Sequence, residues 1–367
     1  MLLEIDDLRT TYTDSSTEDT VTAVDGVSFQ IEEGESFGLV GESGCGKSTI
    51  AKSIMRILPD NGRISNGAVR LNGEDLTELD AEPMRQRRWT DIAFISQSAM
   101  NALDPVYTID TQIKEAIEAH ESWSKQRMDD RVVELFELVG IDPERRHDYP
   151  HQFSGGMKQR AMIAMALVLD PDLIIADEPT TALDVVSQDT ILHHLEELQT
   201  ETGASMLLIT HDMSVVAEMC DRTAVMYAGE LAERGPTEAI FTNPYHPYTL
   251  GLKNAFPSIH GGADSLISIP GAPPPLTNPA DACRFADRCP FAAPECRSSD
   301  PPMKPVAENH DAACARINDV GIETMREQAA TREVWHNVDD APDDASGASR
   351  GDEAASIPTE VSGGDSA

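Results

Sequence analysis

The sequence predicts an α/β fold over its first two-thirds, followed by a small, loop-rich C-terminal extension. An apolar run, SFGLV at 36–40, leads into a glycine-rich loop, and the helical pattern TIAKSIMRIL follows that loop. A second strand-like run, DLIIAD, ends in an acidic residue at 177. After about residue 260 the chain becomes rich in proline and glycine and then in cysteine, which favours an extended connector over another sheet.

Composition limits the class of protein. A chain of 367 residues with 40% hydrophobic residues fits one large domain with extensions, or two domains, around a sizeable core. The 64 acidic residues outnumber the 28 basic ones, for a net charge of −36, which argues against a nucleic-acid partner. An acid excess with few lysines suggests a surface adapted to high salt, as in halophiles. The alternative is an acidic protein from a low-salt organism with an acidic tail.

Membrane and secretion signals are weak. The N-terminal stretch MLLEIDDLRT carries charges and no apolar core of signal-peptide length. The best candidate for a membrane span, AMIAMALVLDPDLIIAD, is interrupted by Asp170 and Asp172. We therefore expect a chain that works inside the cell and reaches any membrane through partner proteins. A reducing compartment disfavours disulfides, so clustered cysteines indicate metal ligands or redox groups.

Residues 41–48, GESGCGKS, match the phosphate-binding pattern G-x-x-x-x-G-K-[ST]. Glycines let backbone N–H groups wrap around phosphate oxygens, and the helix N-terminus adds partial positive charge. In this motif Lys47 reaches the β- and γ-phosphates and Ser48 completes the Mg²⁺ shell. The lysine, the hydroxyl and the flanking strand together strongly disfavour a chance glycine-rich turn.

The acidic end of DLIIADEP supplies the partners that such a loop needs. A strand that delivers Asp177 to its carboxyl end places this carboxylate where Mg²⁺ lies in a P-loop fold. Glu178 points elsewhere and is suited to accept a proton from the attacking water. Alone, an Asp-Glu pair could cap a helix; the phosphate loop upstream favours the catalytic interpretation.

Between these sites lies FSGGMKQR, at 153–160, which alone would indicate only a helix N-cap. Together with the other two motifs it resembles the signature of ABC transporter ATPases. The rest of that family's order is present from residue 1 to about 260: Gln97 matches the Q-loop, Ala182-Leu183-Asp184 the D-loop, and His211 the switch histidine. Tyr12 stands where the family has an aromatic that stacks on adenine, a contact that Val21 or Phe29 could share.

The resemblance implies a P-loop NTPase of ABC type, with a RecA-like core, an antiparallel β subdomain and a helical subdomain at about 98–160. It also implies an ATP and Mg²⁺ site. Its catalytic residues are Glu178, His211 and Gln97, and its Mg²⁺ ligands are Ser48, Gln97 and Asp177. Its nucleotide contacts are Tyr12, Gly41, Ser43, Gly44, Cys45, Gly46, Lys47, Ser48, Thr49, Ser154, Gly155, Gly156 and Asp184.

In this family the signature of one chain caps the γ-phosphate bound to another, so hydrolysis requires a dimer. The resemblance favours a heterodimer with a similar ATPase, with a homodimer as the alternative. It also implies two membrane permeases, contacted through the segment SAMNALDPVYTI, and an extracellular binding protein that delivers the substrate. The chain would then lie on the cytoplasmic face of the membrane.

The extension contains four cysteines, Cys283, Cys289, Cys296 and Cys314, with the spacing C-x5-C-x6-C-x17-C. Four thiolates suit an Fe–S cluster or Zn²⁺, and the absence of C-x2–4-C spacing favours Fe–S. The motifs PYHPYT, PGAPP and CRFADRCP resemble the C-terminal extension of oligopeptide/dipeptide ABC importer ATPases, in which four cysteines bind a [4Fe–4S] cluster. The alternatives are Zn²⁺, and free or disulfide-linked thiols.

These observations predict an ATP-hydrolysing subunit of a di- or oligopeptide ABC importer. The alternatives are the same subunit in a nickel or sugar importer, and a soluble ABC ATPase without a transport role, which is disfavoured because the chain has one cassette and no heptad run. We expect an ATPase domain at 1–260, a cysteine-containing extension at 261–318 and a disordered acidic tail at 319–367.

Overall fold

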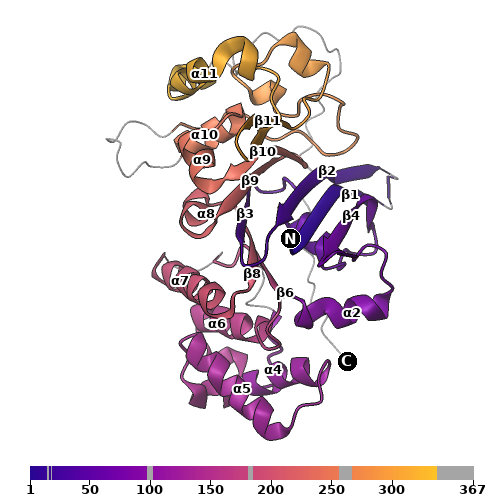
Figure 1. The fold of residues 1–367 in the computed structure, drawn as a ribbon, viewed down its shortest axis with the longest axis vertical. Coiled ribbons are helices and arrows are strands. Elements are labelled where there is room, and N and C mark those ends of the chain that lie inside the picture. The colour runs from indigo at the N-terminus through magenta and orange to yellow at the C-terminus, as the bar shows by residue number, and fades with distance from the viewer. Residues whose placement is uncertain (15, 18, 97–101, 181–184, 256–266, 337–367) are drawn as a thin grey trace, which may run out of the picture.

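A computed structural model describes residues 1–336 except 15, 18, 97–101, 181–184 and 256–266. The molecule is elongated: a group of helices lies at one end, the C-terminal extension at the other, and two sheets lie between them (Figure 1). Within the described residues, no helix is both long and apolar enough to span a membrane.

The centre of the larger sheet is parallel. Its strands are β6 (Ile92–Ile95), β7 (Leu173–Asp177), β8 (Ser205–Thr210), β3 (Ser36–Val40) and β9 (Arg222–Tyr227), adjacent in this order. Antiparallel strands β10 (Glu230–Pro236), β12 (His310–Ala312) and β11 (Lys304–Ala307) extend it beyond β9. The three central strands β3, β7 and β8 are buried along their whole length, because both faces of the sheet are covered.

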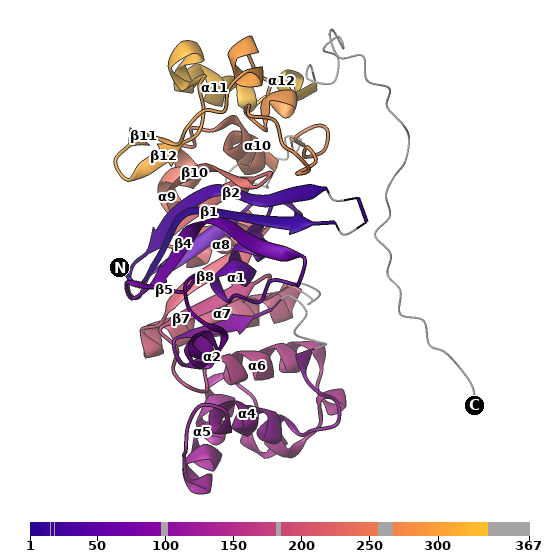
Figure 2. The same ribbon diagram turned by 90° about the vertical axis from the view of Figure 1, so that its right-hand side faces the viewer.

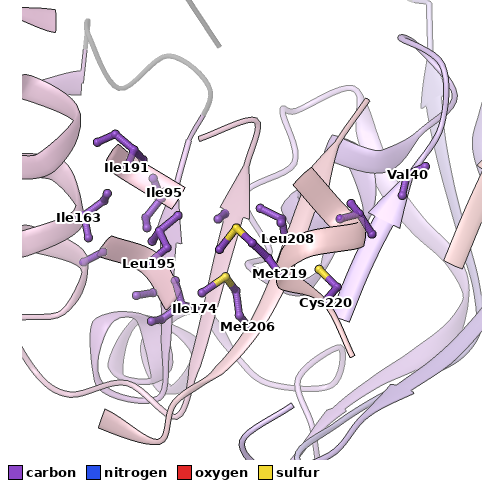
Figure 3. Packing of buried hydrophobic residues seen from close by; sticks show 14 of the residues in the cluster. Val40, Ile95, Ile163, Ile174, Ile191, Leu195, Met206, Leu208, Met219 and Cys220 are labelled. Carbon is purple, nitrogen blue, oxygen red and sulfur yellow. The ribbon is translucent and has the colours of Figure 1, made fainter. Parts of the chain in front are cut away.

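Alternate side chains of these strands enter two different hydrophobic clusters. Along β8, Met206 and Leu208 belong to one cluster, whereas Leu207 and Ile209 belong to the other. The first cluster packs against helices α6 (Gly155–Ala166), α7 (Val185–Thr202) and α8 (Met213–Met219). Figure 3 shows this face, with Ile163, Ile191, Leu195 and Met219 beside Ile174, Met206 and Leu208.

The second cluster joins the parallel sheet to α1 (Lys47–Ile54) and to a four-stranded antiparallel sheet. That sheet has the order β2-β1-β4-β5, formed by β1 (Leu3–Thr13), β2 (Thr20–Ile31), β4 (Gly62–Leu71) and β5 (Glu74–Asp75). Helix α2 (Ala81–Thr90) follows. The predicted RecA-like core with an antiparallel β subdomain is therefore confirmed.

The helical region contains α4 (Ile109–Glu118) and α5 (Lys125–Leu138), and both lie beside α6 at one end of the molecule (Figure 2). Short turns of 3₁₀ helix at Pro143–His147 and Pro150–Gln152 lead to α6. Thr108 caps α4 and Ser124 caps α5, because each hydroxyl accepts a backbone N–H of the first turn at 3.3 Å. The cap at Ser124 sets the start of α5 at Lys125.

The C-terminal extension is joined to the ATPase core through the shared sheet, since β12 pairs with β10. The buried carboxylate of Glu233 on β10 accepts the N–H groups of Tyr245 and His246 at 2.7 and 2.9 Å and contacts His310 Nε2 of β12 at 2.7 Å. Helices α9 (Thr237–Thr242) and α10 (Pro247–Ala255) lie beside this joint (Figure 1). Short helical turns follow at Ala286–Arg288, Pro294–Arg297 and Ile317–Gly321.

The sequence analysis places the start of the disordered tail at residue 319, which is too early. Residues 319–336 include α11 (Ile322–Ala329) and α12 (Arg332–His336), and α11 packs on α10. Met325, Ala329 and Trp335 are buried there, and the Trp335 indole N–H donates to the Ala329 carbonyl at 2.9 Å. The prediction of disorder rested on the acidic composition of residues 319–367, which does not reveal these few buried apolar residues. Residues 337–367 lie outside the described part of the chain.

Candidate functional site

The phosphate loop, residues 41–48, connects the end of β3 to α1. Gly44 and Gly46 have φ of +79° and +111°, in the left-handed region. A Cβ on Gly41 would lie 2.1 Å from the Met226 carbonyl oxygen, and one on Gly46 would lie 2.2 Å from that of Ala23. These obstacles are backbone atoms, so this course of the loop requires glycine at both positions.

The lysine of the motif lies within the curve of the loop. Lys47 Nζ donates to the carbonyl oxygens of Gly41 at 2.7 Å and Glu42 at 3.0 Å. Ser43 and Gly44, at the crest, are exposed. Cys45 is buried, and burial raises the pKa of its thiol, so the side chain is a neutral filler behind the loop. A loop with exposed glycine backbone and an inward lysine is suited to hold a polyphosphate.

The hydroxyl of the motif meets the acidic strand end. Ser48 Oγ donates to Asp177 Oδ1 at 3.0 Å, at the last position of β7. Asp177 is 4% exposed. Burial raises the pKa of its carboxyl and the neighbouring Glu178 adds to this effect, while the bond from Ser48 opposes it. A hydroxyl and a buried carboxylate fit a Mg²⁺ ion, whose charge would offset the cost of burying the anion.

Glu178 and His211, predicted as base and switch, lie together. His211 Nδ1 lies 2.8 Å from both carboxylate oxygens of Glu178. The Glu178 side chain is 12% exposed and that of His211 is 65% exposed. Glu178 has a φ of +52°, unusual for a non-glycine residue, and its N–H donates to the Ile209 carbonyl at 2.8 Å. A strained backbone at this position is consistent with a functional role for Glu178.

The adenine-stacking candidates have different surroundings. Tyr12 on β1 lies opposite Val21 of β2, and its hydroxyl is 3.3 Å from Thr49 Oγ1 on α1. Phe29 is buried and stacked on Phe37, with ring centroids 4.9 Å apart. Phe29 therefore belongs to the core, and the suggestion that it shares the adenine contact is wrong.

The signature segment begins α6. Ser154 caps this helix, accepting the Met157 N–H at 3.4 Å, with Gly155 and Gly156 in the first turn. Helix α6 packs on α4, α5, α7 and β6, whereas α1 packs on β1, β2 and β7. The signature segment and the phosphate loop therefore lie on different parts of the molecule. Gln97 and Asp184, the predicted Q-loop and D-loop residues, lie outside the described residues.

The four cysteines of the extension lie within the described part of the chain. The Cys283 N–H donates to the Cys296 carbonyl at 3.1 Å. At three of the cysteines the sulfur accepts the backbone N–H two residues further on: Phe285 to Cys283, Phe291 to Cys289 and Arg316 to Cys314. Among the residues that the structure describes, no group of three or more His, Cys, Asp or Glu side chains has the arrangement of a metal site.

One contact of the phosphate loop has no signal in the sequence. The N–H of Glu42 donates to the hydroxyl of Tyr248 at 3.0 Å, across 206 positions of the chain. Tyr248 is fully buried on α10, in the region where the extension begins. The PYHPYT segment that contains it pointed to a subgroup of transporters but to no contact with the nucleotide site.

The loop, the Ser48–Asp177 bond and the Glu178–His211 pair on a parallel sheet define a P-loop ATPase. Comparison with protein-family models gives a match to the ABC transporter family over residues 24–181, and to the C-terminal region of oligopeptide/dipeptide transporters over residues 232–296. The chain belongs to the ABC transporter ATP-binding proteins, and within them to the group that carries this C-terminal region.

Comparisons with individual proteins support the same family. A probable peptide ABC transporter ATP-binding protein of Sinorhizobium fredii is 46% identical, covering 87% of this chain and 96% of the relative. A dipeptide transport ATP-binding protein of Bacillus subtilis is 46% identical, covering 80% and 89%. The dimeric cassette MJ0796 bound to ADP and Pi has a TM-score of 0.58 and 27% identity, covering 64% of this chain and 99% of that one.

Proposed function

We propose that this chain is the energy-coupling ATPase subunit of an importer of di- or oligopeptides. The observation that carries this proposal is the match of residues 232–296 to the C-terminal region of oligopeptide/dipeptide transporters, on the same chain as an intact phosphate site. The names of the Sinorhizobium and Bacillus relatives support peptides over the alternatives of nickel and sugars.

The site residues have the following proposed roles. Lys47 and the loop backbone hold the ATP phosphates, while Ser48 and Asp177 hold Mg²⁺, with Gln97 as a further ligand. Glu178 accepts the proton of the attacking water, and His211, hydrogen-bonded to it, orients that carboxylate. Tyr12 stacks on adenine. Ser154, Gly155 and Gly156 cap the γ-phosphate bound to the opposite subunit, with Asp184 at the same interface.

The assembly proposed is an ATPase dimer below two permeases, on the cytoplasmic face of the membrane, served by an extracellular binding protein. The separate placement of α6 and α1 supports a signature that acts on a second subunit. The dimeric form of the MJ0796 cassette supports the same arrangement. We favour a second, similar ATPase as the partner over a second copy of this chain.

We propose further that the four cysteines bind one [4Fe–4S] cluster, with Zn²⁺ as the alternative. The support is the repeated N–H···S pattern and the proximity of the four sulfurs, since Cys314, Cys283 and Cys296 each help to raise the pKa of Cys289. Burial raises the pKa of Cys283 to about 12 and that of Cys314 to about 11, so the thiolates would form only with a metal.

Glu178→Gln should retain ATP binding and lower turnover by about 10²–10⁴-fold, because the amide cannot accept the proton of water. Lys47→Ala should instead weaken nucleotide binding. Both are measured on the assembled complex, as phosphate release at saturating ATP and as ATP affinity. Wild-type turnover by Glu178→Gln would rule out its role as the base.

Purification of the native complex through a tag on this chain should recover two permeases and a second ATPase, identified by mass spectrometry. Its ATP hydrolysis, with the external binding protein added, should rise with di- or oligopeptides and not with Ni²⁺ or sugars. Two copies of this chain without another ATPase would eliminate the heterodimer. Stimulation by Ni²⁺ or a sugar alone would eliminate the peptide substrate.

Anaerobically purified protein should contain four iron and four acid-labile sulfide per chain, the stoichiometry of the proposed [4Fe–4S] cluster. Cys289→Ser should lose this content and loosen residues 283–314, measured as faster amide hydrogen exchange. Cys220→Ala is the matched control, because Cys220 is buried beside β3 and distant in sequence from the four. One zinc per chain without sulfide would replace the cluster by a zinc site, and neither metal would refute both.

The acid excess leads us to propose that the protein is adapted to high salt. At 1 M salt the Debye length is about 3 Å, so repulsion among exposed carboxylates is largely screened. We expect the midpoint of thermal unfolding to rise substantially between dilute buffer and molar KCl. An equal midpoint in both would contradict the adaptation.

A further inference from the structure

The phosphate loop is held by an arginine from the cysteine segment, a contact that none of the motifs above includes. Arg288 stands next to Cys289, in the short helical turn Ala286–Arg288. Its Nη1 and Nη2 donate to the two carboxylate oxygens of Glu42 at 2.9 and 3.0 Å. Glu42 is the second residue of the loop, 246 positions earlier in the chain. A two-pronged arginine–carboxylate bond fixes both direction and distance.

The guanidinium is itself rigidly held. Nε donates to the Pro270 carbonyl at 2.7 Å, and Nη1 lies 3.2 Å from the Tyr227 hydroxyl. The Arg288 side chain is 7% exposed. A buried arginine with three separate partners cannot swing away without leaving donors unsatisfied, which is costly.

Glu42 is gripped at its backbone as well. Its N–H donates to Tyr248, and its carbonyl accepts from Lys47 Nζ. Tyr248 packs on Phe285, with ring centroids 5.4 Å apart, and Phe285 belongs to the same segment as Arg288. The first half of the loop is therefore set by three side chains, two of them anchored in or against the extension.

A second arginine of the cysteine segment, Arg284, holds this segment against strands β2 and β10. Arg284 forms ion pairs with Asp25 on β2 and Glu230 on β10. It also donates to the Ala228 carbonyl, and the adjoining Gly229 N–H donates to the Cys45 carbonyl of the loop at 2.9 Å. Arg284 and Arg288 thus brace the loop from two directions.

We propose that Arg288 is a positioning residue of the ATPase site: it neutralises Glu42 and holds the first half of the phosphate loop in the course that accepts the ATP phosphates. The charge of Glu42 is unfavourable beside a triphosphate unless a cation pairs with it. The C-terminal extension is then a structural part of the nucleotide site as well as an appendage. This inference rests on the proposed nucleotide-binding role of residues 41–48.

The test measures the affinity of the full-length chain for the Mg²⁺ complex of AMP-PNP, a non-hydrolysable ATP analogue, by isothermal titration calorimetry. Arg288→Met should raise Kd by about tenfold or more, because it leaves Glu42 as an unpaired carboxylate in the loop. Glu42→Gln alone should raise Kd by less than Arg288→Met does, because the amide oxygen still accepts a hydrogen bond from Arg288 and no unpaired carboxylate is left in the loop. The double variant should recover most of the loss, a rescue that a merely structural defect would not produce.

Arg297→Met is the matched control, since Arg297 lies in the same extension with its side chain 53% exposed, and should leave Kd unchanged. Arg288→Lys keeps the charge without the two-pronged geometry, and it replaces Arg288→Met in the comparison if thermal unfolding shows that the methionine variant does not fold. A wild-type Kd for the Arg288 variant, or a double variant as weak as the single one, would overturn the proposal. Lys47→Ala separates the cases: if it binds as wild type, the proposed nucleotide site itself is wrong.

Discussion

The structure depends on the close approach of the phosphate loop to two backbone carbonyls. Gly41 and Gly46 lie so near Met226 and Ala23 that no side chain fits between them. Met226 belongs to β9 of the parallel sheet and Ala23 to β2 of the antiparallel sheet, so the loop lies where the two sheets meet. Any shift between the sheets would move the loop, which couples the shape of the phosphate site to the packing of the whole core.

The catalytic side chains lie at the carboxyl ends of the parallel strands, beside the phosphate loop. β3 leads into the loop, β7 ends at Asp177, and β8 is followed by His211. Because these three strands are adjacent and parallel, their ends lie side by side, and the Ser48–Asp177 and Glu178–His211 contacts follow from the topology. The central strands form a rigid, buried frame that places side chains from distant parts of the chain.

Ion pairs with arginine hold several acidic side chains in fixed positions. Asp25 pairs with Arg9 and Arg284, and Glu42 pairs with Arg288. An ion pair between exposed side chains contributes little to the free energy of folding, about 0–1 kcal/mol. The buried ones are different, because removing one partner leaves an uncompensated charge inside the protein. They therefore determine where the extension can sit on the ATPase core more than how strongly it is held.

Local features could be predicted from the sequence because neighbouring residues determine them. The glycines of the loop and the serine that caps α6 each act over a few positions, and the structure contains both features. Composition alone was less reliable. It assigned residues 319–336 to a disordered tail, although Met325 and Trp335 anchor two helices there. The family resemblance allowed Phe29 to share the adenine contact, but it could not show that the core encloses this side chain.

The sequence by itself determined the class of protein, the phosphate loop and the acidic strand end, since each is a short pattern whose chemistry depends on adjacent residues. Only the tertiary structure decided that β12 joins the main sheet, that Tyr248 receives the Glu42 N–H and that Arg288 grips the Glu42 carboxylate. These contacts link positions far apart in the chain, and no local propensity specifies them. They exist because β12 pairs with β10 at the edge of the main sheet, which brings the extension beside the nucleotide site.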